Sequence, residues 1–85
     1  MFVWLISSRD ASSSDLPASF ADGDTVIFMG EAIYLASQFQ FNVAVTVGVI
    51  EADCRIRGIE INDEQLVTYE QLLLLIAKAD KVIRF

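Results

Sequence analysis

The sequence predicts one α/β domain over residues 1–85, with three layers (α/β/α) around a mainly parallel sheet of about five strands, of the Rossmann-like type. Short apolar, β-branched segments alternate with segments whose apolar residues have helical spacing, and parallel sheets are built from this alternation. Residues 43–50 are apolar on both faces of the expected strand, which predicts a central strand covered on both sides. Neither a repeat nor a linker divides the 85 residues, so a single domain accounts for them.

The first part of the chain predicts a strand, a turn and a short helix. Residues 2–6 are apolar and bulky, as in a buried strand, and residues 7–14 are polar and turn-like. Asp15 can cap a short helix that has Pro17 near its first turn and continues to Ala21.

The middle of the chain predicts two strands around a helix. A turn at residues 22–24 leads into a second strand over residues 25–29. Gly30 ends that strand, and residues 32–38 then carry an apolar helical face. In residues 43–50, valines alternate with small or polar residues, and this pattern predicts the third strand.

The last part of the chain predicts two more helix-to-strand units. Residues 51–57 form a short helix that stops at Gly58, because glycine readily takes the left-handed conformation that ends helices. A brief fourth strand over residues 65–68 ends in a threonine that can cap a helix over residues 69–79. Residues 81–85 form the fifth strand.

The composition favours an assembled protein of the cytoplasm. Apolar residues make up 54% of the chain, more than so small a core can bury, and residues 72–76 are apolar around most of their helix. We therefore expect an oligomer, and a homo-oligomer is one form it could take. The net charge of −6 argues against direct nucleic-acid binding. The apolar runs are too short for a membrane span or a signal peptide, so we expect a cytoplasmic protein without membrane contact.

The residue types present exclude several kinds of chemistry. With one cysteine and no histidine, the chain cannot form an internal disulfide, a Ser-His or Cys-His pair, or an ordinary zinc site. Gly30 follows a strand as in a phosphate-binding loop, but one glycine does not make a phosphate cradle. We expect neither a cofactor nor a metal. The acids Asp22, Asp24 and Glu31 near strand ends could hold Mg²⁺, although ordinary turn residues are the commoner case.

Three segments together carry a family resemblance. They are residues 23–36 (GDTVIFMGEAIYLA), residues 53–59 (DCRIRGI) and residues 67–74 (VTYEQLLL). In order and spacing they resemble the DsrH/TusB family of the DsrEFH-like superfamily, over about residues 23–85. Each segment alone is weakly specific, and the combination is more so.

The resemblance implies a DsrEFH-like domain and a function. Proteins of this family are accessory subunits of sulfur-relay complexes, which pass persulfide sulfur toward 2-thiolation of the tRNA wobble uridine (Tus) or toward sulfur oxidation (Dsr). Their partners are DsrE/TusD-like and DsrF/TusC-like sister subunits, and the catalytic cysteine belongs to the DsrE/TusD-like sister. Cys54 falls where many relatives have an aliphatic residue, so the resemblance does not make Cys54 catalytic.

Cys54 is nevertheless the one candidate for catalysis. It lies in the first turn of a helix that follows the third strand, where open α/β sheets place their functional groups. The helix dipole and two arginines, at positions 55 and 57, favour a thiolate, whereas Glu51 and Asp53 oppose it. The alternative is a small buried side chain, which is the commonest role of a lone cysteine.

Four further residues are candidates for interface or structural roles. Arg57, next to Gly58, can grip a carboxylate across an interface or within the fold, or form only a surface ion pair. Phe39 and Phe41 lie in an expected loop, where aromatic rings suggest anchors for a partner.

Three functions therefore remain open. The first is an accessory subunit that is not an enzyme by itself. The second is a sulfurtransferase that uses Cys54. The third is a homo-oligomeric DsrE-like protein of unassigned role.

Overall fold

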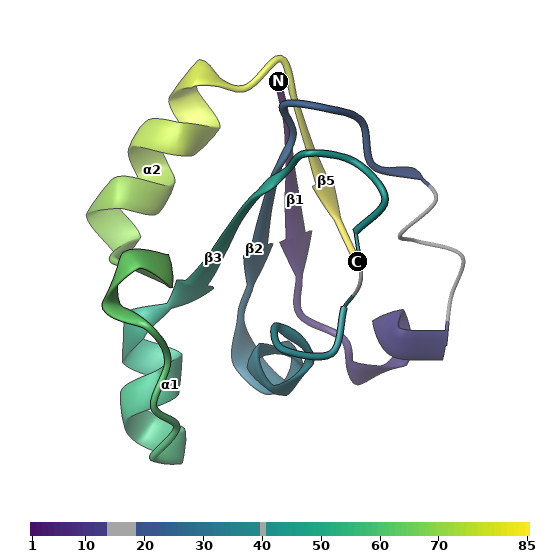
Figure 1. Cartoon of the computed structure of the whole chain (residues 1–85). Coiled ribbons are helices and arrows are strands. Elements are labelled where there is room, and N and C mark those ends of the chain that lie inside the picture. Colours follow the sequence, from purple (N-terminus) through teal and green to yellow (C-terminus); the bar gives the residue numbers. More distant parts are fainter. Residues whose placement is uncertain (14–18, 40) are drawn as a thin grey trace.

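A sheet of five parallel strands lies at the centre of the computed structural model (Figure 1). The structure describes residues 1–13, 19–39 and 41–85, with the backbone alone at residues 12 and 13. The strand order across the sheet is β4-β3-β2-β1-β5. The strands are β1 (Phe2–Ile6), β2 (Thr25–Phe28), β3 (Thr46–Ile50), β4 (Leu66–Val67) and β5 (Lys81–Arg84).

Two α-helices and several 3₁₀ turns connect these strands in the described part of the chain. The α-helices are α1 (Glu51–Arg57) and α2 (Tyr69–Lys78). The 3₁₀ helices include η1 (Arg9–Ser13), η3 (Gly30–Leu35) and η4 (Asp63–Gln65). No helix among the described residues is long and apolar enough to cross a bilayer.

The strand order explains how the helices divide between the two faces of the sheet. From β1 to β4 the chain first joins neighbouring strands in one direction, and α2 then carries it from one edge of the sheet to the other. Parallel crossovers are right-handed, so the first three connections belong on one face and α2 on the other. We call these the η3 face and the α2 face.

The packing of side chains confirms two separate layers. Successive strand residues point to opposite faces, so β1 sends Trp4 and Ile6 to the η3 face and Val3 and Leu5 to the α2 face. On the η3 face these side chains belong to one cluster with residues of η1, η3 and α1. On the α2 face they cluster with Leu72. The predicted α/β fold with helices on both faces of a parallel sheet is therefore confirmed.

The predicted end of α1 at Gly58 and the predicted start of α2 at Thr68 are both confirmed. Gly58 follows α1 with φ 66°, and the Ile59 N–H donates to the Cys54 carbonyl at 3.0 Å, which closes the helix end. Thr68 caps α2, because its Oγ1 accepts from the Gln71 N–H at 3.2 Å while the Gln71 Oε1 accepts from the Thr68 N–H at 2.9 Å.

Other predicted elements differ from the structure. The third strand begins at residue 46 rather than 43, because residues 42 and 43 bend and Ala44 bonds to the turn before β2. The helix expected over residues 32–38 is the 3₁₀ helix η3, followed by a turn, because its backbone bonds span three residues. The fourth strand is limited to two residues. The helix expected after Asp15 falls largely on residues 14–18, outside the described residues.

A buried carboxylate ties the amino ends of β1 and β2 together. Asp24 precedes β2, and its side chain accepts from the Phe2 N–H at 3.1 Å, the Trp4 Nε1–H at 3.0 Å and the Ala21 N–H at 3.0 Å. Burial alone would raise the pKa of Asp24, but these hydrogen bonds hold the pKa below its usual value. Asp24 is thus a structural residue that fixes two strands and the loop before them.

Candidate functional site

The candidate site lies at the carboxyl end of β3, where α1 begins without any intervening loop. Ile50 is the last residue of the strand and Glu51 is the first of the helix. Three residues later, Cys54 faces the interior of the protein and belongs to the core of the η3 face. The predicted position of Cys54, just past the end of an inner strand, is therefore correct, since β3 lies between β2 and β4.

The environment of Cys54 disfavours the thiolate form of its side chain. The side chain is only 4% exposed. Burial raises the pKa of the Cys54 thiol, and the negative charge of Asp53 raises this pKa further. Sulfur transfer needs a thiolate, because the thiolate is the nucleophile. The arrangement therefore weakens Cys54 as a nucleophile at neutral pH.

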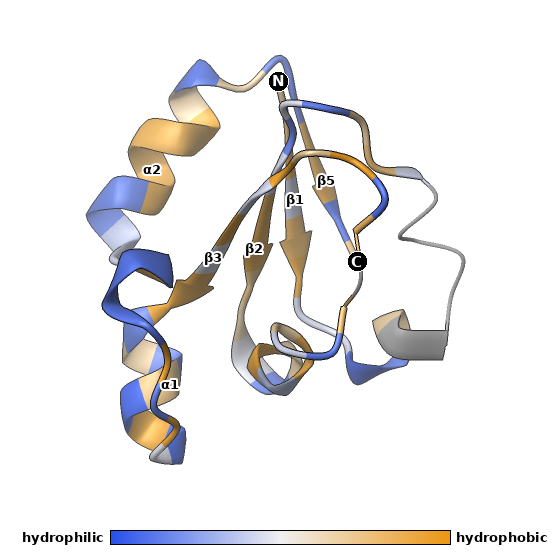
Figure 2. Cartoon of the chain, in the orientation of Figure 1, coloured by the Kyte–Doolittle hydropathy of each residue, from blue (hydrophilic) through white to orange (hydrophobic). Residues whose placement is uncertain are grey.

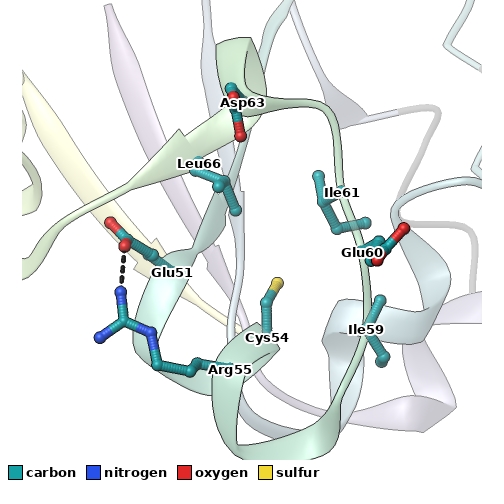
Figure 3. A pocket seen from close by; sticks show the side chains of 8 residues that line it. All are labelled: Glu51, Cys54, Arg55, Ile59, Glu60, Ile61, Asp63 and Leu66. Atoms are coloured by element: carbon teal, nitrogen blue, oxygen red, sulfur yellow. Dashed lines mark hydrogen bonds and ion pairs between the residues drawn. The ribbon is translucent and has the colours of Figure 1, made fainter.

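The nearby charges are held in positions that do not activate the thiol. The guanidinium of Arg55 pairs with Glu51, four residues earlier on the same helix (Figure 3). The carboxylate of Asp53 accepts from the backbone N–H of Gly30 at 2.8 Å, so α1 is fixed to the start of η3. One of the two arginines, Arg55, is thus paired with an acid, while the opposing Asp53 is fixed next to the cysteine.

Arg57 and Gly58 have different roles in the structure. Gly58 ends α1 in the left-handed conformation. Arg57 is half-buried, and its guanidinium has neither a hydrogen bond nor an ion pair within the described part of the chain. Arg57 therefore binds no carboxylate among the described residues, and its contact with a carboxylate across an interface stays a prediction.

A pocket of about 440 Å³ opens beside Cys54. The Sγ atom points into the space between Ile61 and Leu66 (Figure 3). Charged and apolar side chains both surround this space, and the full lining is Glu51, Cys54, Arg55, Ile59, Glu60, Ile61, Asp63 and Leu66. The pocket can hold a small molecule or a partner side chain with an apolar part, and its three acids against one base favour positive over negative charge.

Sequence reasoning missed most of this lining. Residues 59–63 belong to the connection between α1 and β4, and their sequence has no strong periodicity. The sequence does contain one indication of this lining. Ile59 and Ile61 alternate with polar residues in a connection that must return to the sheet. Both isoleucines are half-buried and pack against the core of the η3 face.

The three acids singled out from the sequence do not form one site. Asp22 and Asp24 precede β2, whereas Glu31 follows it at the other end of the strand. Asp22 accepts from the Ala44 N–H at 2.9 Å, Asp24 is the buried structural residue, and Glu31 is exposed. No group of possible metal ligands occurs among the residues that the structure describes.

Phe39 and Phe41 belong to a row of aromatic rings that packs on the core. Phe39 lies 5.3 Å from Phe28 and 5.8 Å from Phe41, measured between ring centres. Phe41 lies 5.5 Å from Phe20, which meets Trp4 edge to face at 4.9 Å. Both residues are half-buried, so their rings complete the η3 face, and their predicted role as partner anchors stays a prediction.

Comparison with known proteins identifies no family for this chain. No protein-family model matches the chain, and no curated protein matches it either.

Proposed function

We propose that this chain is an accessory, non-catalytic subunit of a sulfur-relay complex that serves 2-thiolation of the tRNA wobble uridine in the cytoplasm. The observation that carries the proposal is the state of Cys54, which is buried and has a raised pKa next to Asp53. A relay cysteine needs access to its donor and a large thiolate fraction. Cys54 has little of either, so the working thiol belongs to another subunit.

The DsrH/TusB-like segments support the same proposal. Two of them meet at the carboxyl edge of the sheet: residues 23–36 run through β2 into η3, and residues 53–59 complete α1 and its end. The hydrogen bond from Gly30 to Asp53 joins these two segments. The third segment contains Thr68 and Gln71, which form the cap of α2. The residues that carry the resemblance thus include several whose hydrogen bonds hold the elements of the domain in place.

Exposed apolar side chains support an assembled state with DsrE/TusD-like and DsrF/TusC-like sister subunits. Removing such side chains from water on assembly is favourable by roughly 25 cal/mol per Å². In the described part of the chain the large ones are Met1, Phe2, Tyr34, Ile56, Tyr69, Leu73, Leu74, Val82 and Phe85. They come from both ends of the chain, from η3 and from both α-helices, and so offer surface to more than one neighbour.

A second candidate function, sulfur transfer by Cys54 itself, is favoured by the pocket. The Sγ atom points into a 440 Å³ space that could admit a persulfide group. In that reaction the Cys54 thiolate attacks the outer sulfur of a donor persulfide, a new S–S bond forms on Cys54, and the donor leaves as a thiolate. The reaction requires a partner that lowers the pKa of Cys54, because burial and Asp53 both raise it.

The test is reconstitution with sister subunits. The chain is co-expressed with DsrE/TusD-like and DsrF/TusC-like proteins from the same source, and native mass spectrometry measures the masses of the complexes. The accessory role predicts a complex containing all three chains. It also predicts that Cys54→Ala leaves persulfide transfer by the complex within about twofold of the unmodified complex, because the transferring thiol lies elsewhere.

Two outcomes contradict the accessory role. If no complex forms with the sister subunits, the chain does not belong to this assembly. If a complex forms and Cys54→Ala abolishes transfer while the circular dichroism spectrum and complex mass are unchanged, Cys54 is the transferring thiol and the second candidate is correct. Cys54→Ser serves as the matched variant, because it keeps a small polar side chain at the same site.

A further inference from the structure

The outward side of α2 carries an apolar stripe with a charge at each end. Leu73 is 66% exposed and Leu74 is 63% exposed, whereas Leu72, one residue earlier, is only 6% exposed. On a helix with about 100° between residues, the stripe runs through Glu70, Leu74, Ala77 and Lys78, with Leu73 on its flank. All five residues are exposed, and we call them the α2 stripe. Figure 2 shows the apolar middle of this helix between its hydrophilic ends.

The two charges of the stripe are placed symmetrically around Leu74. Glu70 lies four residues before Leu74, and Lys78 lies four residues after it. The acid and the base are therefore about 12 Å apart along the helix axis, too far to pair with each other. Within the described part of the chain, neither residue takes part in an ion pair.

This symmetry makes the stripe complementary to itself. If two α2 helices meet in antiparallel orientation with both Leu74 residues at the centre, Glu70 of one chain lies opposite Lys78 of the other. The reciprocal pair forms at the other end, as a two-fold interface requires. A parallel pair would place acid opposite acid and base opposite base. The charges therefore select the antiparallel arrangement.

We propose that the α2 stripe binds the α2 stripe of a second copy of this chain, antiparallel about a two-fold axis at Leu74. The leucines lose their contact with water, and the small side chain of Ala77 lets the two helix backbones approach each other. The proposal does not rest on the sulfur-relay function, although Leu73 and Leu74 are among the exposed side chains that also support assembly with sister subunits.

A groove next to the stripe extends the apolar contact. It has a volume of about 330 Å³ and lies between α2 and the edge strand β4, with Leu74 and Lys78 on its wall. Leu66, Val67 and Leu75 also line it, together with Glu64 and Gln71. The apolar surface of Leu74 thus continues down to the edge of the sheet, and an apolar side chain from the second copy can enter the groove.

The expected dimer is reversible. A helix of ten residues is about 15 Å long, so two of them cover less surface than the roughly 1,200 Å² at which stable interfaces begin. The fraction of dimer should therefore rise with protein concentration over the micromolar to millimolar range.

The test uses charge reversal with the whole chain in low-salt buffer. Sedimentation equilibrium measures association of the unmodified chain, of Glu70→Lys, of Lys78→Glu and of an equimolar mixture of the two variants. Each variant alone faces like charges at both ends of the antiparallel pair, so we expect its association to be weaker by roughly tenfold.

The single variants test the orientation, because a parallel pair already has like charges at both ends and neither change would weaken it. The equimolar mixture tests whether these charges pair across the interface. The Glu70→Lys chain carries a base at both ends of its stripe, and the Lys78→Glu chain carries an acid at both ends. When one chain of each kind meets the other, a base therefore lies opposite an acid at both ends of the antiparallel pair. Heterodimers in the mixture should recover the unmodified affinity.

Controls separate the stripe from general effects of charge. Glu31→Lys changes the net charge by the same amount as Glu70→Lys but lies on η3, across the sheet from α2, and should leave association unchanged. Leu74→Asp should prevent association at any salt concentration, whereas the charge effects should shrink in high salt. Far-UV circular dichroism verifies that each variant is folded, and the mixture experiment does not depend on Leu74→Asp folding.

Three results would overturn the proposal. The first is a monomeric chain at every concentration, which would leave the stripe to a different partner. The second is unchanged association of the folded Glu70→Lys and Lys78→Glu variants, which would place self-association on another surface or in a parallel pair. The third is weakened association of both variants with no recovery in the mixture, which would show that Glu70 and Lys78 do not face each other across the interface.

Discussion

At the scale of single residues, two buried polar groups of the molecule have pKa values shifted in opposite senses relative to their charged forms. The carboxylate of Asp24 is buried together with three N–H donors, so its charged form is stabilised. The thiol of Cys54 is buried with a carboxylate beside it, so its charged form is destabilised. Burial is common to both, and the neighbours decide the direction of each pKa shift.

The Asp24 network predicts a pH-dependent stability. Replacing Asp24 by Asn should lower the free energy of unfolding at pH 7 by about 1–3 kcal/mol, because an amide has one oxygen and cannot accept from donors on both sides. The pKa of Asp24 is lower in the folded state, so its contribution is fully present above the unfolded value of about 3.9 and is lost as the pH falls through the folded value. Urea unfolding of both proteins across the pH range from neutral to strongly acidic measures this.

The difference in unfolding free energy between the unmodified protein and the Asp24→Asn variant should therefore narrow below about pH 4. Asp22→Asn is the matched control, because Asp22 is exposed and accepts a single backbone hydrogen bond, from Ala44. Its effect should stay below about 1 kcal/mol. A gap for Asp24→Asn that is constant with pH would contradict the role of the Asp24 charge.

At the scale of elements, local chemistry explains which predictions succeeded. Gly58 and Thr68 end and begin helices through bonds among neighbours in sequence, so their roles can be predicted from the sequence. The start of β3 and the start of η3 involve partners that are distant in the sequence. Residue 44 bonds to the turn at Asp22 and Gly23, and the N–H of Gly30 bonds to Asp53, 23 residues away. Such long-range partners are invisible in a single sequence.

The cap of α2 gives a prediction at this scale. Thr68→Ala should reduce the free energy of unfolding by about 1 kcal/mol, because it leaves the N–H of Gln71 without its acceptor at the helix start. Thr68→Ser keeps the hydroxyl and should lose much less. Thermal unfolding followed by far-UV circular dichroism compares the two variants. Equal losses for both would show that the methyl group of Thr68, rather than its hydroxyl, stabilises the helix.

At the scale of the whole molecule, one long crossover shapes both the fold and the exposed surface. The chain uses four strands to move across the sheet and one helix, α2, to return. That helix buries one side against the α2 face and leaves two leucines exposed on the other. The expectation of an oligomer, drawn from the 54% of apolar residues, now has a definite candidate surface in the α2 stripe.

The candidate site was predictable only in part at this scale. The position of Cys54 past an inner strand follows from the order of elements. The pocket walls do not, because Glu60, Ile61 and Asp63 line the pocket from an irregular connection whose path depends on tertiary packing. The pairing of Arg55 with Glu51 was open in the sequence, since both could also have acted on the thiol.

The measurement that tests the accessory role most directly is the titration of Cys54. The ultraviolet absorbance of the thiolate is followed against pH on the folded chain, with Cys54→Ala as the blank. We expect the thiol to ionise above the ordinary cysteine pKa of about 8.5, because burial and Asp53 both disfavour the thiolate. A thiolate already formed at pH 7 would contradict this expectation and favour the second candidate, in which Cys54 itself transfers sulfur.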